Sequence, residues 1–422
     1  MFQTLRQNAL DQRSLNGDAH CAGQGLLAEL PLACPRCKGP LCKPGQRYLC
    51  ERCGSDYPQF AGLADFRLRD FDSRNQKELA ERFVREWDTL TYEDMIRLRY
   101  SGLRERAISA GRDPSGFGAW TADERAHLSS YKSRGRRHRR ILRGMIEEVR
   151  GLTAPELLLD VGCGWGRDLL HLAGLAKIAV GVDISTFSLL MTKKLLAESG
   201  VTNVRLLLAQ GEHLPFRSEA VDGINSSATI EHFPDPGAFL REASRCLKGK
   251  GWLFLYYPNR FSILPETHTL IPFLGWHSRE EQRAIVARKT GLDWSTNLFS
   301  RHEFLLLLGR TFRADRRLVT GVPGGIEQFM LTSKFCAGSS LRRKAVAAGL
   351  RIARNVPLGD EIASFVAPVH FVAARKGRSA RRETAAPTSS GEPGVDRHND
   401  TSLKDSSGVA RGASHEGAGG PV

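Results

Sequence analysis

The sequence predicts an α/β fold with a doubly wound, mainly parallel sheet, preceded by a small cysteine-rich module. Three observations lead to this prediction. Short apolar runs alternate with helical patterns between about residues 155 and 260, glycines cluster after the first of these runs, and two cysteine pairs lie near the N-terminus. Strands that alternate with helices at this spacing form a parallel sheet with right-handed crossovers.

The first strand leads into a glycine-rich turn. From Leu157 to Ala173 the sequence LLLDVGCGWGRDLLHLA reads as an apolar strand, an acidic residue, three alternate glycines and a helix. Asp160 lies at the carboxyl tip of the expected strand, and the glycines are Gly162, Gly164 and Gly166. Glycines permit backbone angles that a side chain forbids and let a ligand approach the backbone. The helix that follows points its N-terminal amides at that ligand.

The spacing of these glycines distinguishes between cofactors. A dinucleotide-binding fold has the pattern G-x-G-x-x-G, which leaves room for a pyrophosphate. This chain has D-x-G-x-G-x-G, with a carboxylate directed into the loop. A carboxylate there suits a cofactor that carries a cationic ammonium group and no phosphate, and S-adenosyl-L-methionine fits that description.

The following segments continue the alternation. KIAVGVD reads as a second strand that ends in Asp183, about twenty residues beyond the loop, where an acidic side chain can accept hydrogen bonds from ribose hydroxyls. The third strand, NVRLLL, is followed by Gln210 and Gly211. AVDGINSS is the fourth strand, and its Ser226 is assigned to the same cofactor site. A helix from about 236 to 247 and a fifth strand, GKGWLFLYYPN, complete this part of the chain.

Residues from about 136 to 260 resemble a class I S-adenosylmethionine-dependent methyltransferase of the group that includes the ubiquinone- and menaquinone-biosynthesis enzymes. DVGCGWG, GVDIS, AQGEHLPF and IEHFPDP match four of that family's motifs in order. The resemblance implies a Rossmann-like sheet of seven strands whose last strand, APVHFVAARK, is antiparallel. It implies Asp160 and Gly162 near the methionine end of the cofactor, Asp183 at the ribose, and Gln210 with Gly211 at the adenine. The family usually has Asp at the position of Gln210, whose carbonyl can still accept a hydrogen bond.

Two C-x-x-C pairs predict a metal site before this domain. Cys34, Cys37, Cys50 and Cys53 can supply four thiolates in the tetrahedral arrangement that suits Zn²⁺. The twelve-residue gap between the pairs fits a tight zinc ribbon, and a redox dithiol or unligated core cysteines are the alternatives. The segment also resembles the zinc-ribbon module that precedes or partners many methyltransferases. Four sulfur ligands leave no position for a substrate, so we expect a structural ion.

The expected organisation of the chain has five parts. They are an N-terminal flexible segment (1–29), the zinc ribbon (30–66), a helical cap or linker (67–135), the methyltransferase domain (136–376) with a substrate loop (259–298), and a tail (377–422). The tail is rich in Gly, Ser and Pro and has few apolar residues, so burial cannot offset its ordering entropy and we expect disorder.

The composition of the chain limits which partners and which cellular compartment we expect for the protein. No apolar run reaches the roughly 20 residues of a membrane span, and the N-terminus lacks an apolar signal core. Nine unevenly placed cysteines argue against a disulfide scaffold. We therefore expect a cytoplasmic protein without a membrane partner, and the sequence leaves its oligomeric state open.

The net charge of +15 raises the question of a nucleic-acid partner. The densest positive charge lies in the basic helix expected over 132–143, in KSRGRRHRRILRGMIEEVR. An apolar stripe runs along the same helix, which favours a helix packed on the core with a solvated basic face. The stripe consists of Ile141, Leu142, Met145, Ile146 and Val149.

The loop after the fifth strand is expected to bind the methyl acceptor, because ligands of α/β sheets bind outside the carboxyl ends of the strands. His268 is the candidate base, since imidazole titrates near neutral pH and methyl transfer to oxygen benefits from proton removal. Glu266 lies two residues away. In the alternative, His268 only bonds the loop backbone. Glu231 and His232 face the same cleft and rank below His268.

The predicted function is S-adenosylmethionine-dependent methylation, at oxygen, of a small-molecule or sugar-containing biosynthetic intermediate. One alternative is an RNA methyltransferase whose zinc ribbon recognises the substrate; the basic charge supports it, whereas the lid-like loop and the lack of an N/D-P-P-Y motif oppose it. Another is a non-catalytic, cofactor-bound scaffold, which the complete set of cofactor motifs disfavours.

Overall fold

The computed structural model describes residues 27–109, 155–262, 265–266, 268–269, 271–290, 294–312, 314–320, 344, 348 and 369–377. The basic helix expected over 132–143, most of the N-terminal segment and the tail after 377 lie outside the described residues. All described residues belong to one compact unit that ends at Ser379.

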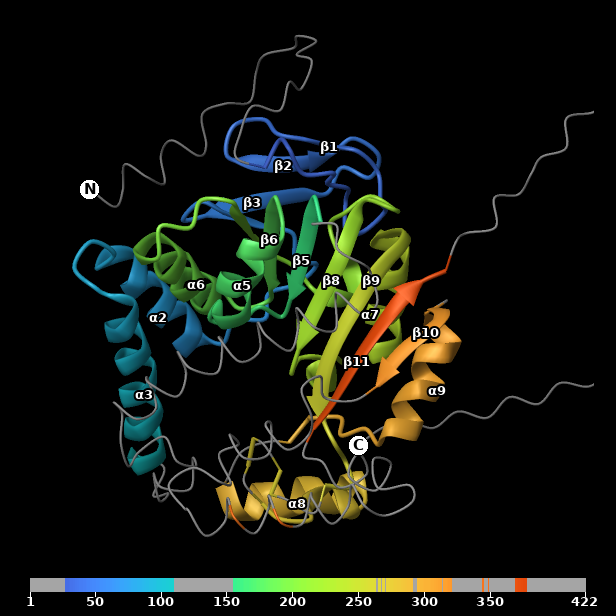
Figure 1. The fold of residues 1–422 in the computed structure, drawn as a ribbon. Helices are drawn as coiled ribbons and strands as arrows, with labels where there is room; N and C mark the ends of the chain where they lie inside the picture. The colour runs from blue at the N-terminus through green and yellow to red at the C-terminus, as the bar shows by residue number, and fades with distance from the viewer. Residues whose placement is uncertain are drawn as a thin grey trace, which may run out of the picture. The chain divides into compact units, whose positions relative to one another are not determined.

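One sheet runs through the described part of the chain and contains eleven strands (Figure 1). Its strands are β1 (Leu41–Cys42), β2 (Arg47–Cys50), β3 (Asp56–Phe60), β4 (Leu63–Asp65), β5 (Leu157–Val161), β6 (Ile178–Asp183), β7 (Val204–Leu208), β8 (Val221–Ser227), β9 (Leu247–Pro258), β10 (Ala314–Thr320) and β11 (Val369–Lys376). They follow the order β1-β2-β3-β4-β7-β6-β5-β8-β9-β11-β10.

The strands β5 to β11 form the predicted doubly wound sheet. The pairs β7–β6, β6–β5, β5–β8 and β8–β9 are parallel. The last strand in the sequence, β11, is antiparallel to both of its neighbours, β9 and β10. The seven-stranded arrangement with an antiparallel final strand is therefore confirmed.

Helices cover both faces of this sheet. The α-helices are α2 (Arg74–Arg85), α3 (Tyr92–Ser109), α5 (Arg167–Leu172), α6 (Thr186–Glu198), α7 (Pro236–Cys246), α8 (Arg279–Thr290) and α9 (Arg301–Thr311), and the short 3₁₀ helices are η2 (Ala173–Leu175), η3 (Gly211–His213), η4 (Ile230–His232) and η5 (Leu274–Trp276). No described helix has both the length and the apolar character needed to cross a membrane.

Local capping signals set several helix starts. Asp235 precedes α7, its side chain accepts a hydrogen bond from the Ala238 amide, and Pro236 occupies the first turn, where a missing N–H costs nothing. Ser300 and Glu303 form a reciprocal capping box at the start of α9. The helix expected over about 236–247 is therefore found almost at its predicted bounds.

The central strand β5 is buried on both faces, which explains why four of its five residues are apolar. Leu159 belongs to the core that contains Phe239 of α7 and Phe304 of α9, whereas its neighbour Leu158 packs with Leu172 of α5 on the other side. Alternate side chains thus enter different cores, and all five residues of the strand are buried. A parallel strand covered on both faces requires this pattern.

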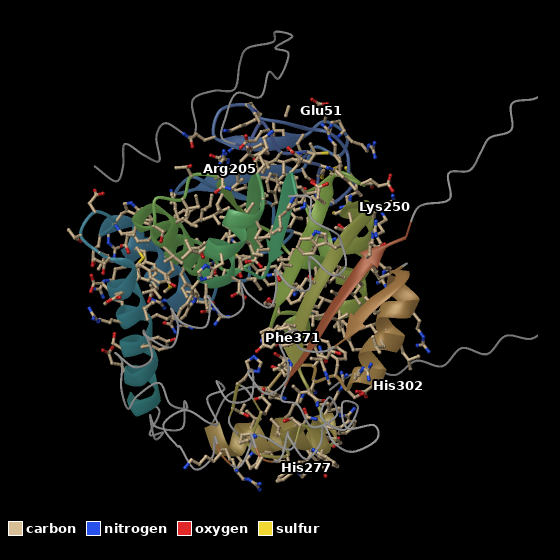
Figure 2. All side chains as sticks on the ribbon, viewed as in Figure 1. Glu51, Arg205, Lys250, His277, His302 and Phe371 are labelled. Atoms are coloured by element: carbon tan, nitrogen blue, oxygen red, sulfur yellow. The ribbon has the colours of Figure 1, made fainter. Side chains whose placement is uncertain are left out.

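The N-terminal strands extend the sheet. β4 pairs in parallel with β7, and the amide of Phe66 donates to the carbonyl of Leu208 at 2.7 Å. Phe66 is fully buried, with its ring 5.1 Å from that of Tyr48 and 5.4 Å from that of Tyr57. Arg205 of β7, labelled in Figure 2, forms an ion pair with Glu29, which precedes the cysteine-rich segment in the chain. The cysteine-rich strands and the β5–β11 sheet therefore share one core.

Candidate active site

A cavity of about 280 Å³ lies at the carboxyl ends of β5, β6, β7 and β8. It is lined by Phe71, Val161, Gly162, Asp183, Ile184, Ala209, Gln210, Gly211, Glu212, Ala228, Thr229, His232, Phe233 and Pro234. Four of the predicted cofactor residues, Gly162, Asp183, Gln210 and Gly211, are in this lining. The cavity thus occupies the position where ligands bind to open α/β sheets.

The glycine loop has a backbone that other residues could not adopt without strain. Gly162 has a φ of +75°, and a Cβ added there would lie 2.1 Å from the side chain of Thr229. Gly166, at the start of α5, has a φ of +79°, and its Cβ would lie 2.6 Å from Thr192. Gly162 thus needs to be glycine where the loop meets the cavity, while Gly164 and Gly166 shape the loop from outside the lining.

Asp183 connects this loop to the second strand. Its Oδ2 accepts a hydrogen bond from the amide of Gly164 at 2.8 Å, and its Oδ1 accepts one from the amide of Ser185 at 2.9 Å. Burial raises the pKa of Asp183, although these amide hydrogen bonds act in the opposite direction. A carboxylate has about four acceptor positions, so Asp183 retains capacity for a ligand in the cavity while it braces the loop.

Besides Gly164 and Gly166, the predicted cofactor residues Asp160 and Ser226 also lie outside the cavity lining. Asp160 is 1% exposed; its Oδ1 accepts a hydrogen bond from Asn225 Nδ2 at 2.6 Å, and its buried Oδ2 has no hydrogen-bond partner. Ser226, fully buried on β8, also has a hydroxyl without a partner. Burial, with a smaller contribution from Asp168, raises the pKa of Asp160 to about 8. A cationic ligand would relieve the cost of ionising such a group.

The segment after β4 reaches the cavity from the N-terminal module. Gln210 Oε1 accepts a hydrogen bond from the amide of Leu68 at 3.0 Å, and Phe71 is part of the cavity wall. The sequence analysis assigned this stretch to a cap and missed Phe71. Its position depends on the pairing of β4 with β7, which no local pattern indicates.

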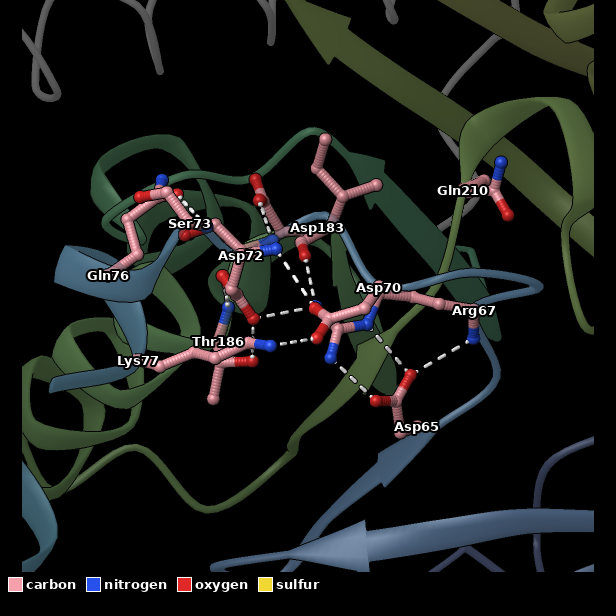
Figure 3. A network of polar contacts seen from close by, with 12 residues as sticks. Asp65, Arg67, Asp70, Asp72, Ser73, Gln76, Lys77, Asp183, Thr186 and Gln210 are labelled. Carbon is pink, nitrogen blue, oxygen red and sulfur yellow. Dashed lines mark hydrogen bonds and ion pairs between the residues drawn. The ribbon is translucent and has the colours of Figure 1, made fainter. Parts of the chain in front are cut away.

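A polar network holds this segment in place (Figure 3). Arg67 donates to Asp65 at 2.6 Å, to Asp72 at 2.7 Å and to the carbonyl of Ile184 at 2.8 Å. Asp72 in turn accepts a hydrogen bond from the amide of Thr186, in the first turn of α6, at 3.1 Å. The network ties the N-terminal segment to the loop after Asp183. The wall of the cavity is therefore built from both parts of the chain.

The four predicted zinc ligands lie together. The sulfur atoms of Cys34 and Cys53 are 3.7 Å apart, those of Cys37 and Cys50 are 3.4 Å apart, and all four lie within 4.8 Å of one another. Sulfurs bound about 2.3 Å from a tetrahedral Zn²⁺ are separated by roughly 3.8 Å. These thiols thus fit a closed zinc site, and they lie outside the cavity lining.

A second polar cluster lies at the edge of the cavity that His232 lines. Glu231, in η4 after β8, is fully buried, and neither of its carboxylate oxygens has a hydrogen-bond partner. Its backbone carbonyl accepts a hydrogen bond from the amide of Asn297 at 2.7 Å, which fixes the position of η4. Burial raises the pKa of Glu231 to about 7, against the opposing effect of His268.

His268 and Glu266, the two candidate catalytic residues named from the sequence, form a pair within this cluster. His268 Nδ1 lies 2.7 Å from Glu266 Oε1, and His268 Nε2 lies 3.7 Å from Glu231 Oε1. Glu266 Oε2 also accepts hydrogen bonds from the amides of His268 and Thr269, at 2.9 and 2.7 Å. Burial acts to raise the pKa of Glu266, but its interactions with His268 outweigh this and lower it to about 2. The lower-ranked Glu231 and His232 thus share one site with His268.

Comparison with known proteins assigns the domain that carries this cavity. Residues 159–255 match the family model described as a methyltransferase domain. This part of the chain is a methyltransferase domain. The match spans the glycine loop, Asp183, Gln210 and the cluster residues Glu231 and His232.

Several relatives carry related names. A ubiquinone biosynthesis O-methyltransferase of Thiobacillus denitrificans is 26% identical over 162 residues, which cover 35% of this chain and 68% of that protein. The ubiquinone biosynthesis O-methyltransferase of Leptothrix cholodnii is 32% identical over 116 residues, or 27% of this chain and 49% of that protein. A probable S-adenosylmethionine-dependent methyltransferase of Mycobacterium tuberculosis is 30% identical over 123 residues, or 29% of this chain and 42% of that protein. The chain thus spans between 42% and 68% of the length of these relatives.

The buried carboxyl of Asp160 should make the free energy of unfolding of this protein depend on pH. Its folded-state pKa of about 8 lies above the ordinary value, so the folded state holds more protons than the unfolded state at intermediate pH. Stability therefore falls as pH rises from about 5 to about 8, by up to about 1.4 kcal/mol per pH unit from this group. Asp160→Asn removes that contribution and keeps an acceptor for Asn225. Denaturant unfolding should show Asp160→Asn gaining stability relative to the native chain as pH rises; a pH-independent difference would contradict the assignment.

Proposed function

We propose that this chain binds S-adenosylmethionine in the cavity and transfers its methyl group to an oxygen of a small biosynthetic intermediate. The proposal rests on one observation: the cavity and the cluster that contains Glu231 and His268 share a residue. His232 belongs both to the lining of the cavity, with the glycine loop and Asp183, and to the cluster that contains His268. The methyltransferase-domain match supports methyl transfer, and the names of two relatives favour an oxygen acceptor in a biosynthetic pathway.

The residues present suit this cofactor. Asp183 has acceptor capacity on the cavity wall for ribose hydroxyls, and the unpaired oxygen of buried Asp160 favours positive charge nearby. Gln210 and Gly211, with Phe71, provide the wall that we assign to the adenine. When bound, S-adenosylmethionine supplies an electrophilic methyl group on a sulfonium.

The cluster at the edge of the cavity accounts for the proton of the acceptor. Glu266 holds His268 through Nδ1, which directs Nε2 toward Glu231, and we assign Nε2 as the atom that takes the proton. As the acceptor oxygen forms its bond to the methyl carbon, the carbon–sulfur bond breaks and the hydroxyl proton passes to His268 Nε2. Alignment of the acceptor with the methyl group would provide much of the remaining acceleration.

We propose Zn²⁺ as the ion of the four cysteines, with a structural role. Cys50 ends β2, whereas the other three cysteines lie in loops and turns outside the strands; the chain then continues through β3 into β4, which leads to Leu68 and Phe71. A stable ribbon thereby holds one wall of the cavity in place, although it supplies no group to the reaction.

The contribution of Phe71 can be measured by cofactor binding. Phe71→Ala removes an aromatic part of the wall, and the lost contact should weaken S-adenosylmethionine binding about tenfold, equivalent to about 1.4 kcal/mol. Phe60→Ala is the matched control, because Phe60 is 39% exposed on β3 and lies outside the cavity lining. Isothermal titration calorimetry measures both; equal affinities for the two variants would remove Phe71 from the site.

The proposed reaction is tested with methyl-labelled S-adenosylmethionine and a cell extract that contains both small molecules and RNA. Label should enter a low-mass, RNase-resistant product, and His268→Ala should lower the rate about a hundredfold, as expected for loss of an acid–base group. Cofactor affinity should stay within about twofold, since His268 is not part of the cavity lining.

His277→Ala is the control for this experiment. His277, labelled in Figure 2, is half exposed just before α8. It lies outside both the cavity lining and the cluster. Its rate should match that of the native chain. Label recovered only in RNase-sensitive polymer would refute the small-molecule acceptor.

A further inference from the structure

The cluster at the acceptor side of the cavity has the composition of a metal site. Glu231, His232 and His268 each offer one ligand atom, and these three atoms lie within 4.8 Å of one another. The set of one carboxylate and two imidazoles is chemically unlike the four thiols of the N-terminal strands. It also lies in another part of the fold, between η4 and the loop after β9.

The buried carboxylate of Glu231 lacks the partners that its burial requires. It is fully buried, and neither oxygen accepts a hydrogen bond. His268 Nε2 lies 3.7 Å and His232 Nε2 lies 4.0 Å from its Oε1, and both distances are beyond hydrogen-bond range. A buried carboxylate costs several kcal/mol unless it is paired or coordinates a metal ion. The imidazoles of His232 and His268 thus lie near the Glu231 carboxylate but form no direct hydrogen bond with it.

The separations fit ligands arranged around an ion. Nitrogen and oxygen atoms bound at about 2.0–2.2 Å from one metal, at tetrahedral or octahedral angles, lie roughly 3.0–3.5 Å apart. The observed 3.7 and 4.0 Å exceed this by a few tenths of an ångström. The side chains of His232 and His268 are 46% and 32% exposed, so their rings have the freedom to close that difference.

The surroundings of His268 match those of a metal-ligating histidine. A histidine bound to a metal through one nitrogen usually donates its other N–H to a carboxylate or carbonyl, which fixes the tautomer and the ring orientation. Glu266 Oε1 accepts from His268 Nδ1 at 2.7 Å, and Glu266 is itself held by the amides of His268 and Thr269. The remaining nitrogen, Nε2, faces Glu231.

We propose that Glu231, His232 and His268 bind one divalent transition-metal ion of the Zn²⁺ class. Imidazole ligands favour such ions over Mg²⁺ and Ca²⁺, which prefer oxygen. Three protein ligands leave a coordination position open, as in catalytic rather than structural sites. Because His232 also lines the cavity, the open position is accessible to an oxygen of the methyl acceptor.

The ion changes how the acceptor loses its proton; this role, unlike metal binding itself, rests on the proposed function. With the metal bound, His268 Nε2 is a ligand and cannot be the base. A metal-bound hydroxyl is more acidic, so its proton leaves to solvent, and the oxygen then forms the bond to the methyl carbon as the carbon–sulfur bond breaks. No oxidant or reductant is required. Glu266 is then a positioning residue that acts through His268.

Co²⁺ is the probe for this site. The full-length protein is first loaded with one equivalent of Zn²⁺, which the thiols retain because Zn²⁺ binds more tightly than Co²⁺ in the same site. Titration with Co²⁺, followed by visible absorption and calorimetry, should then show one further equivalent without a thiolate charge-transfer band. Glu231→Gln and His268→Ala should each weaken Co²⁺ binding at least tenfold, and Glu266→Gln by about ten- to a hundredfold. His277→Ala should bind as the native chain does.

The outcomes separate this inference from the proposed function. No second equivalent of Co²⁺, or equal binding by native protein, Glu231→Gln and His268→Ala with intact circular dichroism, overturns the metal site. Labelled methyl transfer and S-adenosylmethionine binding would then still stand, with His268 as the base. His232→Ala gives an independent check if Glu231→Gln fails to fold. Bound Co²⁺ that is lost in the variants supports the site even if no acceptor is methylated, a result that would count against the proposed function alone.

Discussion

The hydrogen bonds between the glycine loop and the end of β6 are the constraint on which the cavity depends. The amide of Gly162 donates to the carbonyl of Val182 at 2.7 Å, and the amide of Gly164 donates to Asp183 Oδ2 at 2.8 Å. They hold the turn after β5 against the neighbouring strand, with Gly162 and Asp183 both on the cavity wall. The positive φ angles of the loop are therefore part of the architecture of the site.

The loop in turn needs a rigid support, which the buried sheet provides. β5 lies between β6 and β8, and its side chains alternate between two cores. The same arrangement buries Asp160 beneath the loop, where the hydrogen bond from Asn225 satisfies only one of its oxygens. A polar group held in this way is costly for stability and useful for binding positive charge, which is common where proteins give up stability for function.

The N-terminal strands and the cluster of Glu231, His232, Glu266 and His268 are two additions to the sheet and glycine loop described above. Parallel pairing of β4 with β7 places Leu68 and Phe71 at the cavity, and the loop after β9 brings His268 and Glu266 to η4. Both additions meet the cavity on residues of the methyltransferase domain, at Gln210 and at His232. We infer that they adapt a shared cofactor-binding domain to the particular acceptor of this chain.

The sequence alone determined the alternation of strands and helices between about residues 155 and 260, the doubly wound sheet and the glycine loop, and it named Asp183, Gln210, Glu266 and His268 as candidate site residues. These features depend on hydrophobic alternation, on turn residues and on short spacings, all of which are local in the chain. Only the tertiary structure decided that Phe71 lines the cavity, that Asp160 and Ser226 lie outside its lining, and that Glu231 and His232 join His268. Those relations connect residues far apart in the sequence, and they arise from strand pairing and core packing, which leave no local pattern.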